Sequence, residues 1–208
     1  MTEEQSKEKL SFIAEARREQ MLEAAIRTLD EIGYVKTSLS QIAKRAGIST
    51  ALISYHFSDK TDLMNFVLTK LVERSTSFVL ERVRKETTAQ AKLNAFIAAS
   101  LDYQRTHPAH YTALVEIVFN ARTSDNIPYY KLNDEDEDDA LKRELLQIFR
   151  DGQSSGEFGP FHPEVMASLI RGAIDEYTLT FGDTKKLDPE TYCRELVELV
   201  SRAVKGGK

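Results

Sequence analysis

Polar side chains that can contact a nucleic acid cluster in residues 49–60 of the 208-residue chain. Hydroxyl and imidazole groups can form hydrogen bonds with base edges and with phosphates. Catalysis would need an acid, a base or a nucleophile arranged beside them, and no such set is visible. We therefore predict DNA contacts: to phosphates from Ser38, Tyr55 and Lys60, to bases from Thr50, Ala51, Ser54 and His56, and from Ser49 at the start of the same helix.

Two short helices must position these side chains. Ser38, followed three residues later by Gln41, has the form of a capping box, so a helix is expected to start there. Gly47 is expected to end that helix, because glycine adopts the left-handed conformation at little cost. Ser49 is the expected cap of a second short helix. Two short helices joined by a glycine turn predict a helix-turn-helix, whose second helix enters the major groove of DNA.

The charge balance is acidic overall and basic locally. The chain has 28 Lys and Arg residues against 33 Asp and Glu residues, a net charge of -5, which by itself argues against a DNA-binding protein. Six acidic residues form one run at 134–139, interpreted as a solvated loop because it lacks the spacing and central glycine of a calcium loop. Residues 36–60 carry four basic residues and one acidic residue. Lys60 follows Ser58, the expected cap of the next helix, whose first turn favours a phosphate.

Helices are expected throughout the chain. No Gly or Pro occurs between residues 48 and 107, and apolar residues recur at helical spacing over residues 13–32. Further helices are predicted at residues 91–105, 111–122, 140–153 and 163–181, and from residue 189. Because no segment resembles a strand, the predicted fold class is all-α. The polar amino terminus, the lack of a long apolar stretch and the single cysteine, Cys193, predict a cytoplasmic protein without a transmembrane helix or a metal site.

These motifs resemble the TetR family of one-component bacterial transcriptional regulators. The similarity covers, in order, Gly33-Tyr34 at the end of the first helix, TSLSQIAKRAGIS at 37–49, and SYHFSDKTDLM at 54–64 with Phe57, Lys60 and Leu63 at the family spacing. The last two predicted helices, which include DPETYCRELVELVSRAV at 188–204, are also similar to those of the family. Ser54 departs from the pattern, because many members have an aromatic residue at this position.

The resemblance implies a three-helix DNA-binding domain, expected at residues 1–62, and a larger helical domain at residues 63–208 that binds a small molecule. The implied protein is a repressor that binds a palindromic operator as a homodimer and is released by an apolar or aromatic effector. It is neither an enzyme nor a cofactor-binding protein. Two alternatives stay open: an activator or ligand-independent regulator of this fold, and a small helical enzyme or carrier with a degenerate helix-turn-helix. The expected dimer residues, in the last two helices, are Leu169, Ala173, Leu196, Val197, Leu199 and Val200.

Aromatic and polar side chains at helical spacing are candidates for lining the effector pocket, although the same spacing is also typical of a packed core. The candidate pocket residues are Phe96, Ser100, Tyr103, His107, Phe119 and Phe149. Glu116 is the single charge within LVEIVF. We interpret it as a solvated residue, with contact to a cationic ligand as the alternative.

Overall fold

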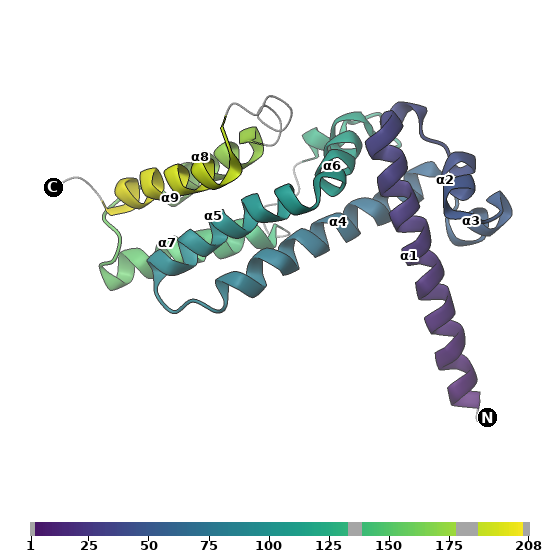
Figure 1. Ribbon diagram of the computed structural model, residues 1–208, viewed down its shortest axis with the longest axis horizontal. Helices are drawn as coiled ribbons and strands as arrows, with labels where there is room; N and C mark the ends of the chain where they lie inside the picture. Colours follow the sequence, from purple (N-terminus) through teal and green to yellow (C-terminus); the bar gives the residue numbers. More distant parts are fainter. Residues whose placement is uncertain (1–2, 133–138, 178–186, 206–208) are drawn as a thin grey trace. The chain divides into compact units, whose positions relative to one another are not determined.

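Helices make up the regular structure of the chain. The computed structural model describes residues 3–132, 139–177 and 187–205. No strand occurs in these ranges, which confirms the predicted all-α fold class, and none of the described helices is long and apolar enough to cross a membrane. In chain order, and as labelled in Figure 1, the elements are α1 (Glu3–Lys36), α2 (Leu39–Ala46), α3 (Thr50–His56), α4 (Lys60–Val83), α5 (Ala89–Thr106), α6 (Pro108–Asn120), the 3-10 helix η1 (Tyr129–Lys131), α7 (Ala140–Ser155), α8 (Pro163–Glu176) and α9 (Pro189–Lys205).

Capping explains where the helices depart from their predicted boundaries. α6 starts at Pro108, three residues before the predicted start, because proline fits the first helical position, where its missing N–H is not needed. Asp59 caps α4, since its Oδ1 accepts a hydrogen bond from the amide of Asp62 at 2.9 Å. The prediction of Ser58 as this cap is therefore wrong by one residue. The end predicted for the helix of residues 163–181 lies outside the described residues.

Unit 1, the first of two compact units, is assembled from two separate stretches of chain, Met1–Val72 and Pro108–Leu132. Its core combines apolar residues of α1 to α4 with Ala113, Ile117 and Ala121, which come from α6 and the residue just after it. All three are at most 1% exposed. The predicted domain boundary at residues 62–63 falls inside α4. The helix-turn-helix thus shares its hydrophobic core with a helix that lies some 50 residues further along the chain.

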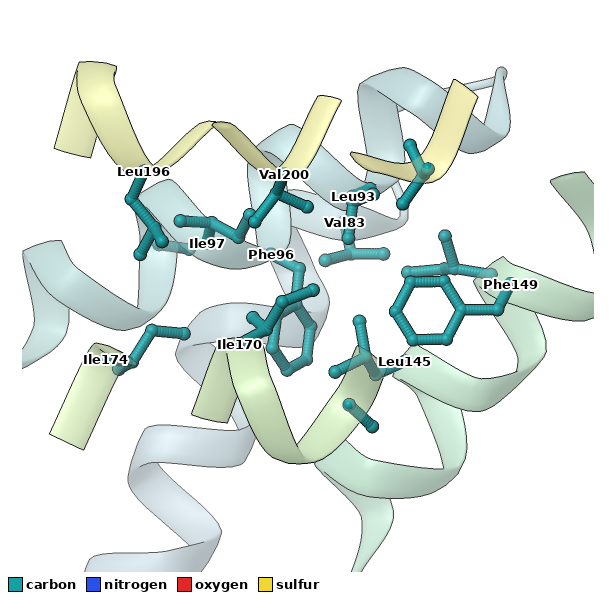
Figure 2. Packing of buried hydrophobic residues seen from close by; sticks show 14 of the residues in the cluster. Val83, Leu93, Phe96, Ile97, Leu145, Phe149, Ile170, Ile174, Leu196 and Val200 are labelled. Carbon is teal, nitrogen blue, oxygen red and sulfur yellow. The ribbon is translucent and has the colours of Figure 1, made fainter. Parts of the chain in front are cut away.

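Unit 2 comprises Glu73–His107 and Asn133–Lys208. Its core is built from the end of α4 and from α5, α7, α8 and α9, and the side chains of Phe96, Leu145, Ile170 and Val200 meet in it (Figure 2). A polar contact also joins the last two helices, because the hydroxyl of Tyr192 on α9 donates to the carbonyl of Ala173 on α8 at 2.6 Å.

Charged groups join α7 to α8 at the surface of unit 2. Of the acidic run, residues 134–138 lie outside the described residues, and Asp139 caps α7 by accepting from the amide of Lys142 at 2.9 Å. The other carboxylate oxygen of Asp139 pairs with Arg171 on α8 at 2.8 Å, and Lys142 pairs with Glu164 at 3.2 Å. The last residue of the run therefore has a structural role.

Candidate nucleic-acid interface

The first helix of the motif, α2, begins at the predicted cap. Ser38 has extended backbone angles, and its Oγ accepts a hydrogen bond from the amide of Gln41 at 3.3 Å. The same hydroxyl donates to Gln41 Oε1 at 2.8 Å, so the two side chains are bonded to each other at the start of the helix. On the inner face of α2, Ile42, Ala43 and Ala46 are buried. The outer face leaves its polar residues exposed.

The turn between the two helices closes around Gly47. This glycine has φ 66 and ψ 32, the left-handed conformation, and its amide bonds to the carbonyls of Ala43 and Lys44. The amide of Ile48 also bonds to the carbonyl of Ala43, at 3.0 Å. The bonds from Gly47 to Lys44 and from Ile48 to Ala43 form a Schellman motif. This motif satisfies carbonyls that a helix end otherwise leaves without partners. Ile48 packs against the core of unit 1, which fixes the direction in which α3 leaves the turn.

The second helix, α3, has one buried face and one exposed face. Ser49 caps it through a bond from the amide of Leu52 at 3.2 Å, and Ile53 and Phe57 anchor it in the core. The predicted base-contacting residues Thr50, Ala51 and Ser54 are exposed, and His56 is half-buried. Tyr55 is 82% exposed, which is unusual for so large an aromatic side chain. Of the predicted DNA-contacting residues of α3, Thr50, Ala51, Ser54 and Tyr55 are therefore exposed, and His56 is only partly so.

Lys60, a predicted phosphate contact, is already engaged within the chain. It is the first residue of α4, and its Nζ donates to the carbonyl of Tyr34 at 2.5 Å. The same ammonium group lies 4.0 Å from the centroid of the Tyr34 ring. Burial lowers the pKa of Lys60 and raises that of Tyr34. An ammonium group has three donors, so this arrangement holds the cation in place without using all of them.

Other charges of the basic segment differ in their surroundings. The guanidinium of Arg45 is paired with the carboxylate of Glu31 on α1, and this hydrogen bond lowers the pKa of Glu31. Lys36 and Lys44 are exposed. Because Glu31 lies outside residues 36–60, the count of charges in that segment overstates the positive charge that the surface presents.

Three residues of α1 that the sequence did not single out help to build this region. Gln20 Nε2 donates to the carbonyl of Ala46, the last residue of α2, at 2.7 Å, and Arg17 donates to Gln20 Oε1 at 2.7 Å. The guanidinium of Arg18 lies 5.4 Å from the ring centroid of Phe57, just after α3. No local pattern marks Gln20 and Arg18, because their partners Ala46 and Phe57 lie 26 or more residues away.

Comparisons with known proteins agree with this geometry. Residues 21–66, which span the end of α1, all of α2 and α3 and the start of α4, match the family described as bacterial regulatory proteins, tetR family. The helix-turn-helix segment of the chain is thus similar to that of TetR-family regulators. The HTH-type transcriptional regulator BetI of Cronobacter sakazakii is 28% identical over 102 residues, which are 48% of this chain and 50% of the relative. The chain thus aligns with about half of the length of this curated relative.

Solved structures of bacterial regulators extend the likeness to nearly the whole fold. The fatty acid degradation regulator FadR from Bacillus halodurans superposes with a TM-score of 0.77 at 18% identity, covering 92% of this chain and 97% of that one. The transcriptional regulator FadR from Bacillus subtilis, solved in complex with stearoyl-CoA, gives a TM-score of 0.74 at 23% identity, covering 91% and 98%. At these identities the likeness shows the fold, an amino-terminal helix-turn-helix followed by further helices.

The six candidate pocket residues are dispersed over the two units. Phe96 and Phe149 are buried in the core of unit 2, and the hydroxyl of Ser100 donates to the carbonyl of Phe96 at 2.8 Å. Tyr103 and His107 stack on each other with ring centroids 4.5 Å apart. Phe119 belongs to unit 1, where it is 56% exposed and stacks on Tyr130.

Three further observations concern possible sites for a ligand, a metal ion or thiol chemistry. An open groove of about 360 Å³ in unit 2 is lined by residues other than the six candidates: Arg82, Lys85, Glu86, Ala95, Ala98, Ala99 and Asp102. Across the described part of the chain, no group of three or more His, Cys, Asp or Glu side chains is placed to hold a metal ion. Cys193 is partly buried, and burial raises the pKa of its thiol.

The six candidate dimer residues fall on two faces of α8 and α9. Leu196 and Val200 are buried in the core of their own chain. Ala173 and Val197 are partly buried beside that core. Leu169 on α8 and Leu199 on α9 are 55% and 61% exposed, and Val165 on α8, which was not among the six, is 64% exposed. The large apolar side chains most exposed on α8 and α9 are therefore Val165, Leu169 and Leu199.

Proposed function

We propose that the protein is a DNA-binding transcriptional regulator and that residues 1–62 carry its DNA-contacting surface. The observation that carries this proposal is the division of α3 between a face anchored by Ile53 and Phe57 and a face that exposes Thr50, Ser54 and Tyr55. A recognition helix needs such a division, because one face must be held by the domain while the other enters the major groove.

Homodimerisation is the second part of the proposal. A dimer sets the two recognition helices about 34–36 Å apart, one turn of DNA, so that each can read one half of a palindromic operator. Val165, Leu169 and Leu199 support a dimer through α8 and α9, because isolated large apolar side chains on two neighbouring helices gain free energy when a second copy covers them.

A small-molecule effector that releases DNA is the third part, so that the protein is a repressor acting in the cytoplasm. The likeness to a FadR structure solved with stearoyl-CoA supports a ligand in this fold. By linkage, an effector weakens DNA binding only if it binds the DNA-free conformation more tightly than the DNA-bound one. A reporter gene behind the operator distinguishes a repressor from an activator, since deletion raises expression in the first case and lowers it in the second.

DNA binding is tested by fluorescence anisotropy with duplexes from the promoter region of the protein's own gene, across a series of salt concentrations. We expect Tyr55→Ala to weaken binding on the order of tenfold, equivalent to about 1.4 kcal/mol. Tyr130→Ala is a matched control, because Tyr130 is also an exposed tyrosine of unit 1 but lies outside the helix-turn-helix. Absence of binding by the unmodified protein at every salt concentration would favour the helical carrier or enzyme.

A further inference from the structure

The carboxylate of Glu116 on α6 accepts a hydrogen bond from the backbone of α1 at the point where Gly33 interrupts that helix. Gly33 interrupts α1 with φ 73 and ψ 170, so the amide of the next residue, Tyr34, turns away from the helix axis. This amide donates to Glu116 Oε2 at 2.7 Å, across 82 residues of sequence. The side-chain amide of Asn120, one turn further along α6, also donates to Glu116 Oε2, at 3.3 Å. Glu116 is therefore oriented from two sides.

Space at this contact is limited. A Cβ atom added at Gly33 would lie 3.1 Å from Glu116 Oε2, so the glycine serves both the left-handed backbone and the close approach of the carboxylate. Tyr34 is half-buried, and an amide in such a position loses free energy if it has no acceptor. An ionised acceptor forms a stronger hydrogen bond than a neutral one.

Tyr34, whose amide is held by Glu116, also contacts the residues at the start of α2 and the start of α4. Its carbonyl accepts from Lys60 Nζ at 2.5 Å and from the amide of Thr37 at 3.2 Å, and its ring lies beneath the Lys60 ammonium. The hydroxyl of Thr37 donates to the carbonyl of Gly33 at 2.7 Å, and Thr37 is buried. A displacement of Tyr34 would therefore move Lys60 and the residue that precedes the cap of α2.

We propose that Glu116 is a positioning residue for DNA binding, which acts through Tyr34 on Lys60. This inference rests on the proposed function and adds α6 to the machinery that sets the geometry of the DNA-contacting surface. Glu116 fixes the Tyr34 amide, Tyr34 fixes the Lys60 ammonium, and the ammonium is held where a phosphate can accept from its remaining donors. The hydrogen bond gives Glu116 a structural partner, which the interpretation of a solvated residue did not foresee.

The salt dependence of DNA binding tests this route. Each lost phosphate contact reduces the slope of log K against log salt by about one, so losing the Lys60 contact in both protomers of a dimer reduces it by about two. We expect Glu116→Ala to reduce the slope in the same direction as Lys60→Ala and to weaken binding on the order of tenfold. In the double variant the two effects should not add, because both remove the same contact.

Conservative variants distinguish positioning from general stability. Glu116→Gln keeps an acceptor oxygen at the same reach, so it should restore most of the affinity and the slope. Glu116→Asp keeps the charge but is one methylene shorter, so it should behave like Glu116→Ala. Hydrogen exchange supplies a readout without DNA: the Tyr34 amide should exchange faster in Glu116→Ala and Glu116→Asp than in Glu116→Gln.

The outcomes separate the two proposals. If the unmodified protein binds no duplex, the proposed function fails and this inference fails with it. If the unmodified protein binds while folded Glu116→Ala keeps its affinity and slope, the inference alone is overturned. Additive effects of Glu116→Ala and Lys60→Ala would also overturn it. Should Glu116→Ala not fold, the comparison of Glu116→Gln with Glu116→Asp decides, and equal behaviour of these two variants would refute the proposed route.

Discussion

Gln20 Nε2 donates to the carbonyl oxygen of Ala46 at 2.7 Å, which ties the middle of α1 to the last residue of α2. This carbonyl is one of the four that a helix end leaves without an intrahelical partner. The bond is partly buried, so water does not replace it fully when the side chain is removed.

Removing the Gln20 side chain should lower the stability of the protein. We expect Gln20→Ala to reduce the free energy of unfolding by about 1 kcal/mol, the usual net contribution of such a bond. Urea denaturation followed by circular dichroism measures the change. Gln147→Ala is the matched control, because Gln147 donates to Asp151 at an exposed position. Equal losses in the two variants would show that the link to Ala46 contributes nothing particular.

Gly47→Ala and Gly156→Ala should both lower the stability of the protein. Gly47→Ala should also weaken DNA binding. Gly47 and Gly156 both have positive φ angles, 66 and 79, and a Cβ added at either position meets no atom within 4 Å. The cost of Gly47→Ala and of Gly156→Ala is therefore backbone strain, about 1–2 kcal/mol each. Because Gly47 sets the direction of α3, only Gly47→Ala should weaken DNA binding. Thermal unfolding and anisotropy together check this, and a comparable loss of affinity in folded Gly156→Ala would contradict it.

A charge on the exposed face of α8 or α9 should dissociate the proposed dimer. Leu169→Glu and Leu199→Glu would each place a carboxylate in an apolar contact, where an unpaired charge is strongly disfavoured. Size-exclusion chromatography with light scattering should show monomers near 23.6 kDa in place of dimers. Ile127→Glu, at an exposed apolar position of unit 1, should leave the dimer intact. Dimers that persist in both leucine variants would exclude this face as the interface.

The cap of α9 predicts a dependence of stability on pH. Asp188 accepts from the amide of Thr191 at 2.8 Å, and this hydrogen bond lowers the pKa of Asp188. A carboxyl whose pKa is lower in the folded state stabilises the fold above its unfolded pKa and loses that contribution as pH falls through the folded pKa. Asp188→Ala should therefore lower the melting temperature at pH 7, with a difference that shrinks below about pH 4. A difference independent of pH would show that the charge of Asp188 is not involved.

The helix-turn-helix could be predicted from sequence because its signals are local. The hydroxyls of Ser38 and Ser49 accept from backbone amides three residues ahead, and the amide of Gly47 donates to carbonyls three and four residues back. Both partners of each hydrogen bond therefore lie within one short stretch of sequence. The cap of α4 shows the limit of this reasoning. Ser58 and Asp59 are both good caps, and the choice between them depends on the exact exit of the chain from α3.

Contacts over long separations could not be predicted in the same way. The bond between Tyr34 and Glu116 joins positions 82 residues apart, and a single charge in an apolar helix is typical of many solvated residues. Periodicity placed Leu196, Leu199 and Val200 in one helix, but it did not show which of them face the chain's own core. That depends on the packing of α9 against α5 and α8, which the sequence of α9 alone does not contain.

The contribution of α6 to the core of unit 1 has a consequence for any attempt to isolate the DNA-contacting part of the protein. A fragment that stopped at Val72 would lack Ala113, Ile117 and Ala121, and it would expose to water the apolar side chains of α1 that they cover. It would also lack the acceptor of the Tyr34 amide. Exchange of this helix-turn-helix between relatives, by engineering or by recombination, therefore requires that the α1 and α6 surfaces be exchanged together.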